Sequence, residues 1–417
     1  MTALSRHSRR LASAAGLIAV LLAATAATPP AGASPATPSS PSSPWTIQPS
    51  PSPSGSTGSS LAAVSCWAIG GCMAVGSTTT GGSDQTSLAE VLHRSTWAIV
   101  STPPVPMAAD VLLVSVSCAD RDHCAAVGYT VSSANSTVRP LAEAWNGTLW
   151  TRTPLPLPIG ATWATLAGVS CPAADDCTAV GGYIRNQLNG EEKPLAEQWN
   201  GSAWSVLAAP NPQAENGSSF SGVDCSVVGS CEVVGDYDYG DVGQSVFAYG
   251  DDGTTWTSQT QANPLGQEYN SDNGVSCADA DHCAAVGSWT NEGLLGLAQY
   301  WDGSGWFRQS AKDPAGSATG ELNAVSCVTA TVCTAVGDFS DNLNDVHTAP
   351  MAEVLDGPAW TQVATDDPAG ASRLLSGVSC RAPDTCVAVG ASYSSKMGTT
   401  LVEVSSSPSG DRRALSG

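Results

Sequence analysis

The chain has 417 residues, and its 37 acidic residues outnumber 16 lysines and arginines to give a net charge of −21. This balance argues against nucleic acid or anionic lipid as a partner, because both are bound through clustered Lys and Arg. Attraction of cations and plain solubility are the two roles that the charge leaves open.

Residues 1–33 have the pattern of a secretory signal peptide. A basic start, an apolar run and a small-residue cleavage motif follow one another: Arg6, Arg9 and Arg10, then residues 11–27, then Ala31-Gly32-Ala33. The apolar run is shorter than the roughly 20 residues that a membrane-spanning helix needs. We therefore expect a secreted, extracellular protein without membrane insertion. Residues 34–44 are rich in Pro and Ser, which predicts a flexible or extended linker.

From residue 45 onward, a recurring pair of cysteines organises the chain. Five residues separate the two cysteines of a pair, and a short apolar run ending in Val-Gly follows. The pairs use all 14 cysteines and recur about every 50 residues. A fixed period of that length indicates a repeat architecture. We number the repeats 1 to 7 by their pairs: Cys66/Cys72, Cys118/Cys124, Cys171/Cys177, Cys225/Cys231, Cys277/Cys283, Cys327/Cys333 and Cys380/Cys386.

The expected export makes these pairs candidates for disulfides, which persist outside the cytoplasm. Zinc sites usually need two close pairs with shorter spacing, so five intervening residues suit a bridge across a hairpin better. His123 and His282 each precede a second cysteine, which leaves a metal site as a weaker alternative. We predict seven bridges, each within one repeat.

Each repeat contains four short strand-like runs. In repeat 2 these are residues 113–118, 124–128, 141–145 and 150–158, and Asn146-Gly147 between the last two is a strong signal for a tight hairpin. Four antiparallel strands in a repeat of this length are typical of a propeller blade. The sequence therefore predicts an all-β fold over residues 45–405: a seven-bladed β-propeller with four antiparallel strands per blade. Residues 406–417 are predicted to be a disordered tail.

The tryptophans suggest how such a ring would close. A Trp opens the fourth run of repeats 1 to 6, whereas repeat 7 has a third run, residues 401–404, and no Trp after it. Trp45 stands before the first cysteine pair. We therefore predict that residues 45–50 pair with 401–404 and supply the missing outer strand of the last blade.

The glycine that ends the second run and the hairpin that leads to Trp resemble the kelch and galactose-oxidase class of propellers. The Val-Ser-Cys and Cys-x-Ala-Val-Gly runs look closest to cysteine-paired repeats of secreted actinobacterial proteins. The chain departs from kelch because only one repeat ends its second run in a double glycine, Gly181-Gly182. Residues 251–256 also resemble the Asp-box hairpin of sialidases, once. The resemblance implies a propeller scaffold, but the paired cysteines and scattered arginines do not match the copper site or the arginine cluster of those enzymes.

Specificity in a ring of similar blades requires a break in the repeat. The third-strand Glu recurs in five repeats and is therefore interpreted as structural, whereas the loops between second and third strands differ in every repeat. Acids and aromatics gather there or nearby in repeats 4 to 6. We predict a ligand-binding set there: Asp236, Asp238, Tyr239, Asp241, Asp272, Trp289, Asp338 and Asp341.

Two functions fit this set. The first is a non-catalytic binding or scaffold protein that recognises a glycan or an extracellular protein, as a monomer and without a cofactor. The second is a carbohydrate-active hydrolase or lyase that uses the loop acids. Alternating Asp residues can also hold Ca²⁺, although no full calcium-loop motif is present. Two alternatives without a ligand also remain. The aromatic side chains would then cover gaps between blades, and the acidic side chains would only keep the protein soluble.

Overall fold

In the computed structural model the chain divides into Met1–Ser42 and Ser43–Gly417. The structure describes residues 45–186, 190–212, 217–238, 243–264, 269–290, 293–342, 348–368, 371–394 and 397–405. The predicted signal peptide, linker and tail lie outside these ranges. Among the described residues, no helix has the length and apolar character to cross a membrane.

The described residues form short antiparallel strands, and each cysteine repeat supplies them in the same order. The first strands are β2 (Ser56–Ala68), β6 (Ala108–Cys118), β10 (Trp163–Ala173), β14 (Gly217–Val227), β18 (Asn270–Asp279), β22 (Thr319–Thr329) and β26 (Ser372–Ala382). The second strands are β3 (Gly71–Thr80), β7 (Cys124–Ser132), β11 (Asp176–Ile184), β15 (Ser230–Asp238), β19 (His282–Thr290), β23 (Val332–Ser340) and β27 (Thr385–Ser394).

The third and fourth strands complete each repeat. The third strands are β4 (Gln85–His93), β8 (Val138–Trp145), β12 (Glu192–Trp199), β16 (Gln244–Asp251), β20 (Leu294–Trp301), β24 (Ala349–Asp356) and β28 (Met397–Ser405). The fourth strands are β5 (Thr96–Val100), β9 (Trp150–Arg152), β13 (Trp204–Val206), β17 (Trp256–Gln259), β21 (Trp306–Gln309) and β25 (Ala359–Val363), with β1 (Trp45–Ile47) beside β28.

The grouping of these strands contradicts the predicted seven separate four-stranded blades. They form three eight-stranded sheets and one four-stranded sheet. Two repeats merge wherever a third strand pairs in parallel with the next first strand. One residue pair makes each junction: Gln85 with Asp110, Glu192 with Gly217, and Leu294 with Thr319. The fold is therefore a repeated, propeller-like all-β fold in which most sheets contain two repeats.

The two ends of the folded part share one sheet, as predicted. Trp45 pairs with Ser405 and Ile47 pairs with Glu403, antiparallel. The indole of Trp45 is 2 % exposed and packs in a cluster with Leu375 and Leu401. The N-terminal strand thus covers the edge that β28 would otherwise expose.

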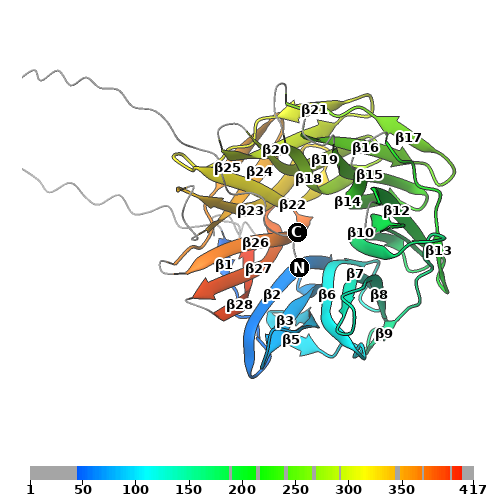
Figure 1. Ribbon diagram of the computed structural model, residues 1–417. Coiled ribbons are helices and arrows are strands. Elements are labelled where there is room, and N and C mark those ends of the chain that lie inside the picture. Colours follow the sequence, from blue (N-terminus) through cyan, green and yellow to red (C-terminus); the bar gives the residue numbers. More distant parts are fainter. Residues whose placement is uncertain are drawn as a thin grey trace, which may run out of the picture. The chain divides into compact units, whose positions relative to one another are not determined.

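The first strands contact one another in order from β2 to β26, and β26 contacts β2, so the circle of repeats is closed (Figure 1). A hydrogen-bonded belt follows this circle. The backbone N–H of each first cysteine donates to the residue before the first cysteine of the preceding repeat, as Cys118 does to Ser65 at 3.0 Å. The belt closes where the N–H of Cys66 donates to Ser379 Oγ at 3.1 Å. The acceptor is serine everywhere except in repeat 4, where Asp224 accepts from the N–H of Cys277 at 2.7 Å.

The seven predicted disulfides are all present, and each links the first two strands of one repeat. The predicted hairpins between third and fourth strands also form. Gly147, for example, has a φ of 88°, and Asn146 Oδ1 accepts from the N–H of Thr148 and Leu149. Both kinds of turn lie at the same end of each antiparallel sheet. We call that end the disulfide face, and the opposite end, where second strands lead into third strands, the loop face.

Candidate functional site

On the loop face, the structure brings Asp236 and Asp272 close enough for their charges to interact. Asp236 lies near the end of β15, half-buried, and the amide Nε2 of Gln244 donates to its Oδ2. Burial raises the pKa of Asp236 to about 6, and the nearby charge of Asp238 adds to that effect. Asp238 itself is exposed, whereas Tyr239 and Asp241 lie outside the described residues.

Asp272 is completely buried, at the position where other repeats have Leu or Phe, such as Leu322 or Phe220. Gln261 Nε2 donates to Asp272 Oδ2 at 2.7 Å, but Oδ1 has no partner among the described residues. Burial raises the pKa of Asp272 to about 8. The side chain therefore belongs to the interior, and burial favours its neutral form.

Glu192, which the sequence analysis did not select, belongs beside Asp236. It begins β12, is half-buried, and lies over Gly182, where a built Cβ would be 2.1 Å from Glu192 Oε1. Burial raises the pKa of Glu192 to about 7, with the charge of Asp236 as a second cause. The only sequence signal was an acid at the first residue of the third strand, where the other repeats have uncharged residues.

Asp338 lies farther around the same face, in repeat 6. Asn323 Nδ2 donates to Asp338 Oδ1 at 3.0 Å, and burial raises the pKa of Asp338 to about 6. Asn323 also lines a central cavity of about 200 Å³ that small side chains of the first strands otherwise surround. Asp341 is exposed just beyond β23 and makes no part of this contact set.

Trp289, the predicted aromatic platform, has one face covered. The guanidinium of Arg308 lies 4.2 Å from its ring centroid, and its indole N–H donates to the carbonyl of Gly296 at 3.1 Å. In repeat 3, Arg185 lies in the same way over Tyr183, at 5.7 Å. These rings are thus held by intramolecular cation–π contacts, which reduces the surface left for stacking on a sugar.

Three second cysteines of the predicted bridges lie in the interior. Cys72 and Cys333 are each 1 % exposed, and Cys386 is 2 % exposed. Each of the three is bridged as predicted and packs in an apolar cluster that joins two neighbouring repeats. The prediction for Cys72, Cys333 and Cys386 is thus confirmed: they are disulfide-bonded, structural residues of the core.

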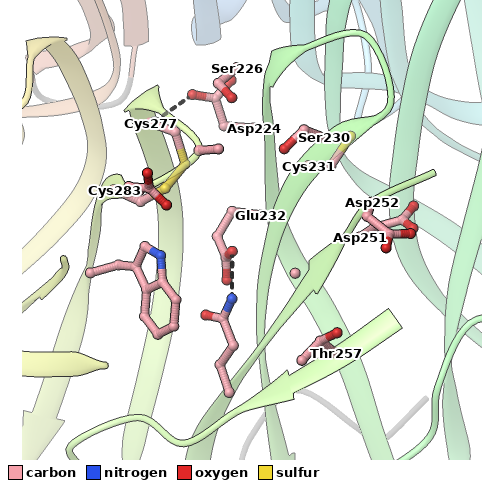
Figure 2. Close-up of a pocket in the computed structure, with 15 residues that line it drawn as sticks. Asp224, Ser226, Ser230, Cys231, Glu232, Asp251, Asp252, Thr257, Cys277 and Cys283 are labelled. Carbon is pink, nitrogen blue, oxygen red and sulfur yellow. Dashed lines mark hydrogen bonds between the residues drawn. A yellow bond between two sulfur atoms is a disulfide. The ribbon is translucent and has the colours of Figure 1, made fainter. Parts of the chain in front are cut away.

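A different cavity lies on the disulfide face, between repeats 4 and 5 (Figure 2). It has a volume of about 210 Å³, and we call it the acidic groove. Its lining includes one aromatic side chain, Trp301, and five carboxylates: Asp224, Glu232, Asp251, Asp252 and Asp281. None of the described residues that line it is basic. The sequence analysis selected neither Trp301 nor any of these five carboxylates.

Glu232 is the central side chain of the acidic groove in Figure 2. It is 6 % exposed, and Gln259 Nε2 donates to its Oε2 at 3.0 Å. Its Oε1 has no hydrogen-bond partner among the described residues. Burial raises the pKa of Glu232 to about 8.

The corresponding position between repeats 2 and 3 is also hollow, with a volume of about 190 Å³, but its lining is aromatic. Trp145, Trp199 and Trp204 line this second cavity, which we call the apolar groove. Ala125 occupies the position of Glu232 in the acidic groove, and Trp145 occupies the position of Asp251. The scaffold therefore supplies the hollow, and substitutions within the repeat decide its chemistry.

The described residues contain no group of three or more His, Cys, Asp or Glu side chains that could hold a metal ion. His123 and His282, the histidines of the disulfide turns, instead contact Asp120 and Asp279 at 2.9 Å and 2.7 Å through Nδ1.

No protein-family model and no curated protein matches the chain. Among solved structures, YCF48 from Cyanidioschyzon merolae is similar at 13 % identity and a TM-score of 0.50, over 86 % of this chain and 98 % of that one. YCF48 bound to D1 peptide has 13 % identity and a TM-score of 0.48, over 87 % and 96 %. A fucose-recognising lectin of Aleuria aurantia, a six-bladed β-propeller, has 13 % identity and a TM-score of 0.42, over 75 % and 97 %.

Likeness at these identities concerns the fold alone. It agrees with the arrangement of sheets described above, and it does not confirm the predicted kelch type. The chain is a repeated, propeller-like all-β protein with a disulfide in every cysteine repeat.

Proposed function

We propose that this protein is a non-catalytic extracellular binding protein that recognises a glycan or another protein through the loop face of repeats 3 to 6. The observation that carries the proposal is the set of half-buried carboxylates there, Glu192, Asp236 and Asp338. The ion pairs of the described residues involve none of the three. Buried carboxyl groups without a basic partner cost folding free energy, and such breaks of local rules concentrate at functional sites.

A ligand that brings donors to this face would remove part of that cost. Sugar hydroxyls and the basic or amide groups of a protein both supply donors. The contact of Arg308 with Trp289 supports the protein alternative, since it covers one face of the aromatic ring on which a sugar would stack. The seven disulfides support an oxidising location, which is where a secreted binding protein would act.

One experiment addresses both ligand classes. Purified protein would be applied to a glycan array and to an array of synthetic peptides with varied charge. We expect hits on one array whose affinity falls at least tenfold in Asp236→Asn and in Asp338→Asn. Asp356→Asn is the matched control, because Asp356 ends β24, is exposed and lies on the disulfide face. Absence of hits on both arrays, or hits that the two loop-face variants leave unchanged, would contradict the proposal.

A second function, hydrolysis or elimination on a polysaccharide, is favoured by one observation. Glu192 and Asp236 interact by charge, and burial raises the pKa of both, to about 7 and about 6. Coupled carboxyls of this kind can hold one proton for general acid–base chemistry. Turnover of polysaccharides with a bell-shaped pH dependence, abolished by Glu192→Gln, would support the enzyme. Absence of turnover across an acidic and neutral substrate panel would remove it.

A further inference from the structure

The acidic groove differs from the rest of the scaffold at several positions at once. The residue after the second cysteine is apolar or Thr in the other repeats, and Glu232 replaces it in repeat 4. Asp224 replaces the belt serine of the same repeat, and Asp251 replaces the tryptophan that lines the apolar groove. These three changes place carboxylates around one cavity of about 210 Å³.

Gln259 shows that the side chain of Glu232 is held in a defined orientation. The indole N–H of Trp306 donates to Gln259 Oε1 at 2.6 Å. Because an indole can only donate, the amide must turn its oxygen to Trp306 and its NH₂ to Glu232. Glu232 Oε2 accepts that hydrogen bond at 3.0 Å. Its other oxygen, Oε1, is buried without a described partner, and the Glu232 side chain lines the groove.

Gly250 provides room for this arrangement. A Cβ built at Gly250 would lie 2.8 Å from Gln259 Nε2 and 3.5 Å from Glu232 Oε2. Other repeats have a larger side chain there, such as Ala144 or Tyr300. The hollow therefore depends on a glycine as well as on the acidic substitutions.

We propose that the acidic groove between repeats 4 and 5 binds one cationic side chain, the guanidinium or ammonium group of an arginine or lysine on a partner protein. Glu232 Oε1 accepts the central hydrogen bond. Asp224, Asp251, Asp252 and Asp281 supply the surrounding negative charge, and Trp301 supplies an aromatic wall of the kind that attracts cations. This site lies on the face opposite to the loop-face acids, and it stands whether or not they bind a ligand.

Other ligands match the groove less well. The described acids do not form a group that could hold a metal ion, and an anion would meet carboxylates on all sides. A neutral sugar carries no positive charge to pair with the carboxylates that line the groove. Burial raises the pKa of Glu232 to about 8, so the arrival of a cation would also release its proton at neutral pH. Burial also raises the pKa values of Asp224 and Asp251.

The test uses blocked amino acids as probes, with titrations followed by saturation-transfer NMR and calorimetry. We expect N-acetyl-arginine amide or N-acetyl-lysine amide to bind, and N-acetyl-citrulline amide, which lacks the charge, to bind at least tenfold more weakly. Calorimetry in two buffers of different ionisation enthalpy should show proton release at pH 7. Equal binding of the citrulline probe, or no binding of either cation, would overturn the proposal.

Variants separate the groove from the rest of the protein. Glu232→Ala restores the residue found in repeats 2 and 5, Ala125 and Ala284, so it should fold normally and weaken cation binding at least tenfold. Gly250→Ala should weaken it by displacing Gln259. Asp356→Asn, at the exposed end of β24 and outside the lining of the groove, is the control and should leave cation binding unchanged. If Glu232→Ala is folded by circular dichroism and binds the cation as the unchanged chain does, the groove is not the site.

Discussion

Replacement of Glu197 by glutamine should raise the stability of the protein at neutral pH and leave it unchanged at pH 4. Glu197 is completely buried in β12, and neither carboxyl oxygen has a partner among the described residues. Burial raises its pKa from the ordinary 4.5 to about 8. At pH 7 the folded protein therefore holds a proton on Glu197 that the unfolded chain releases.

The direction and size of the effect follow from that proton. Because the folded-state pKa lies above the unfolded one, Glu197 lowers stability progressively as the pH rises from about 4.5 to about 8. At pH 7 the solution lies about 2.5 pH units above the pKa of the unfolded chain. Each unit corresponds to about 1.36 kcal/mol, so Glu197 lowers the free energy of unfolding by about 3 kcal/mol. Glutamine does not titrate, so Glu197→Gln should gain about 3 kcal/mol between pH 4 and pH 7 relative to the unchanged chain. Repeat 5 already has glutamine here, since Gln299 is buried at the same position.

Urea unfolding with the disulfides intact, followed by tryptophan fluorescence at pH 4, 5.5 and 7, measures the difference. The other buried carboxyls are common to both proteins and cancel in the comparison. Gln299→Glu is the converse variant and should lose stability increasingly as the pH rises. A difference between Glu197→Gln and the unchanged chain that is the same at all three pH values would refute the reasoning.

Three further predictions concern the scaffold. Trp45→Ala should lower the free energy of unfolding by about 3–5 kcal/mol in urea titrations, because it empties the buried site that holds β1 against β28; a loss below 1 kcal/mol would contradict the importance of this closure. Ser379→Ala should cost about 1–3 kcal/mol by removing the acceptor of the Cys66 N–H, whereas Asp224→Ser, which restores the belt residue, should cost less; equal losses would count against the belt. Thiol titration of the denatured, unreduced protein should find no free thiol, since all seven pairs are bridged, and two or more thiols per chain would disprove the pairing.

The repeated features were predictable because each is local and recurs in every copy. The constant spacing of the cysteine pairs set the seven disulfides, and Asn146-Gly147 marked its hairpin without tertiary information. The displaced Trp45 also predicted its partner strand correctly. The merging of repeats into eight-stranded sheets could not be read in this way, because it depends on a single residue pair at each junction, such as Gln85 with Asp110. Nothing in the pattern of a third strand reports how close the next first strand lies.

The burial of the bridges depends on tertiary packing in the same way. Cysteine spacing predicts which sulfurs join, but it does not report which of them the next repeat covers. Cys72, Cys333 and Cys386 are buried because residues of a neighbouring repeat pack in the same apolar clusters. These sulfurs are therefore part of the contact between repeats.

The candidate sites were less predictable, for physical reasons that differ by residue. Asp272 was selected because it breaks the leucine position, and the structure shows that the same position is buried between repeats. Trp289 lies where expected, but only the fold brings Arg308 onto its ring. Asp224 escaped notice because an aspartate can accept the belt hydrogen bond as serine does, so the substitution leaves the strand pattern intact.

The departures from the repeat are not spread evenly around the circle. Asp224, Glu232, Gly250 and Asp272 all lie in repeats 4 and 5, on both faces of the same junction, and each replaces a residue that other repeats keep small, neutral or apolar. Burying Glu232 and Asp272 raises both pKa values to about 8, which costs stability that a serine, alanine or leucine would not cost. A chain built only for stability had neutral alternatives available from its own neighbouring repeats. Buried glutamates also recur in five third strands, but they follow the repeat, whereas Glu232 and Asp272 break it. That break is the reason to seek a binding surface at this junction first.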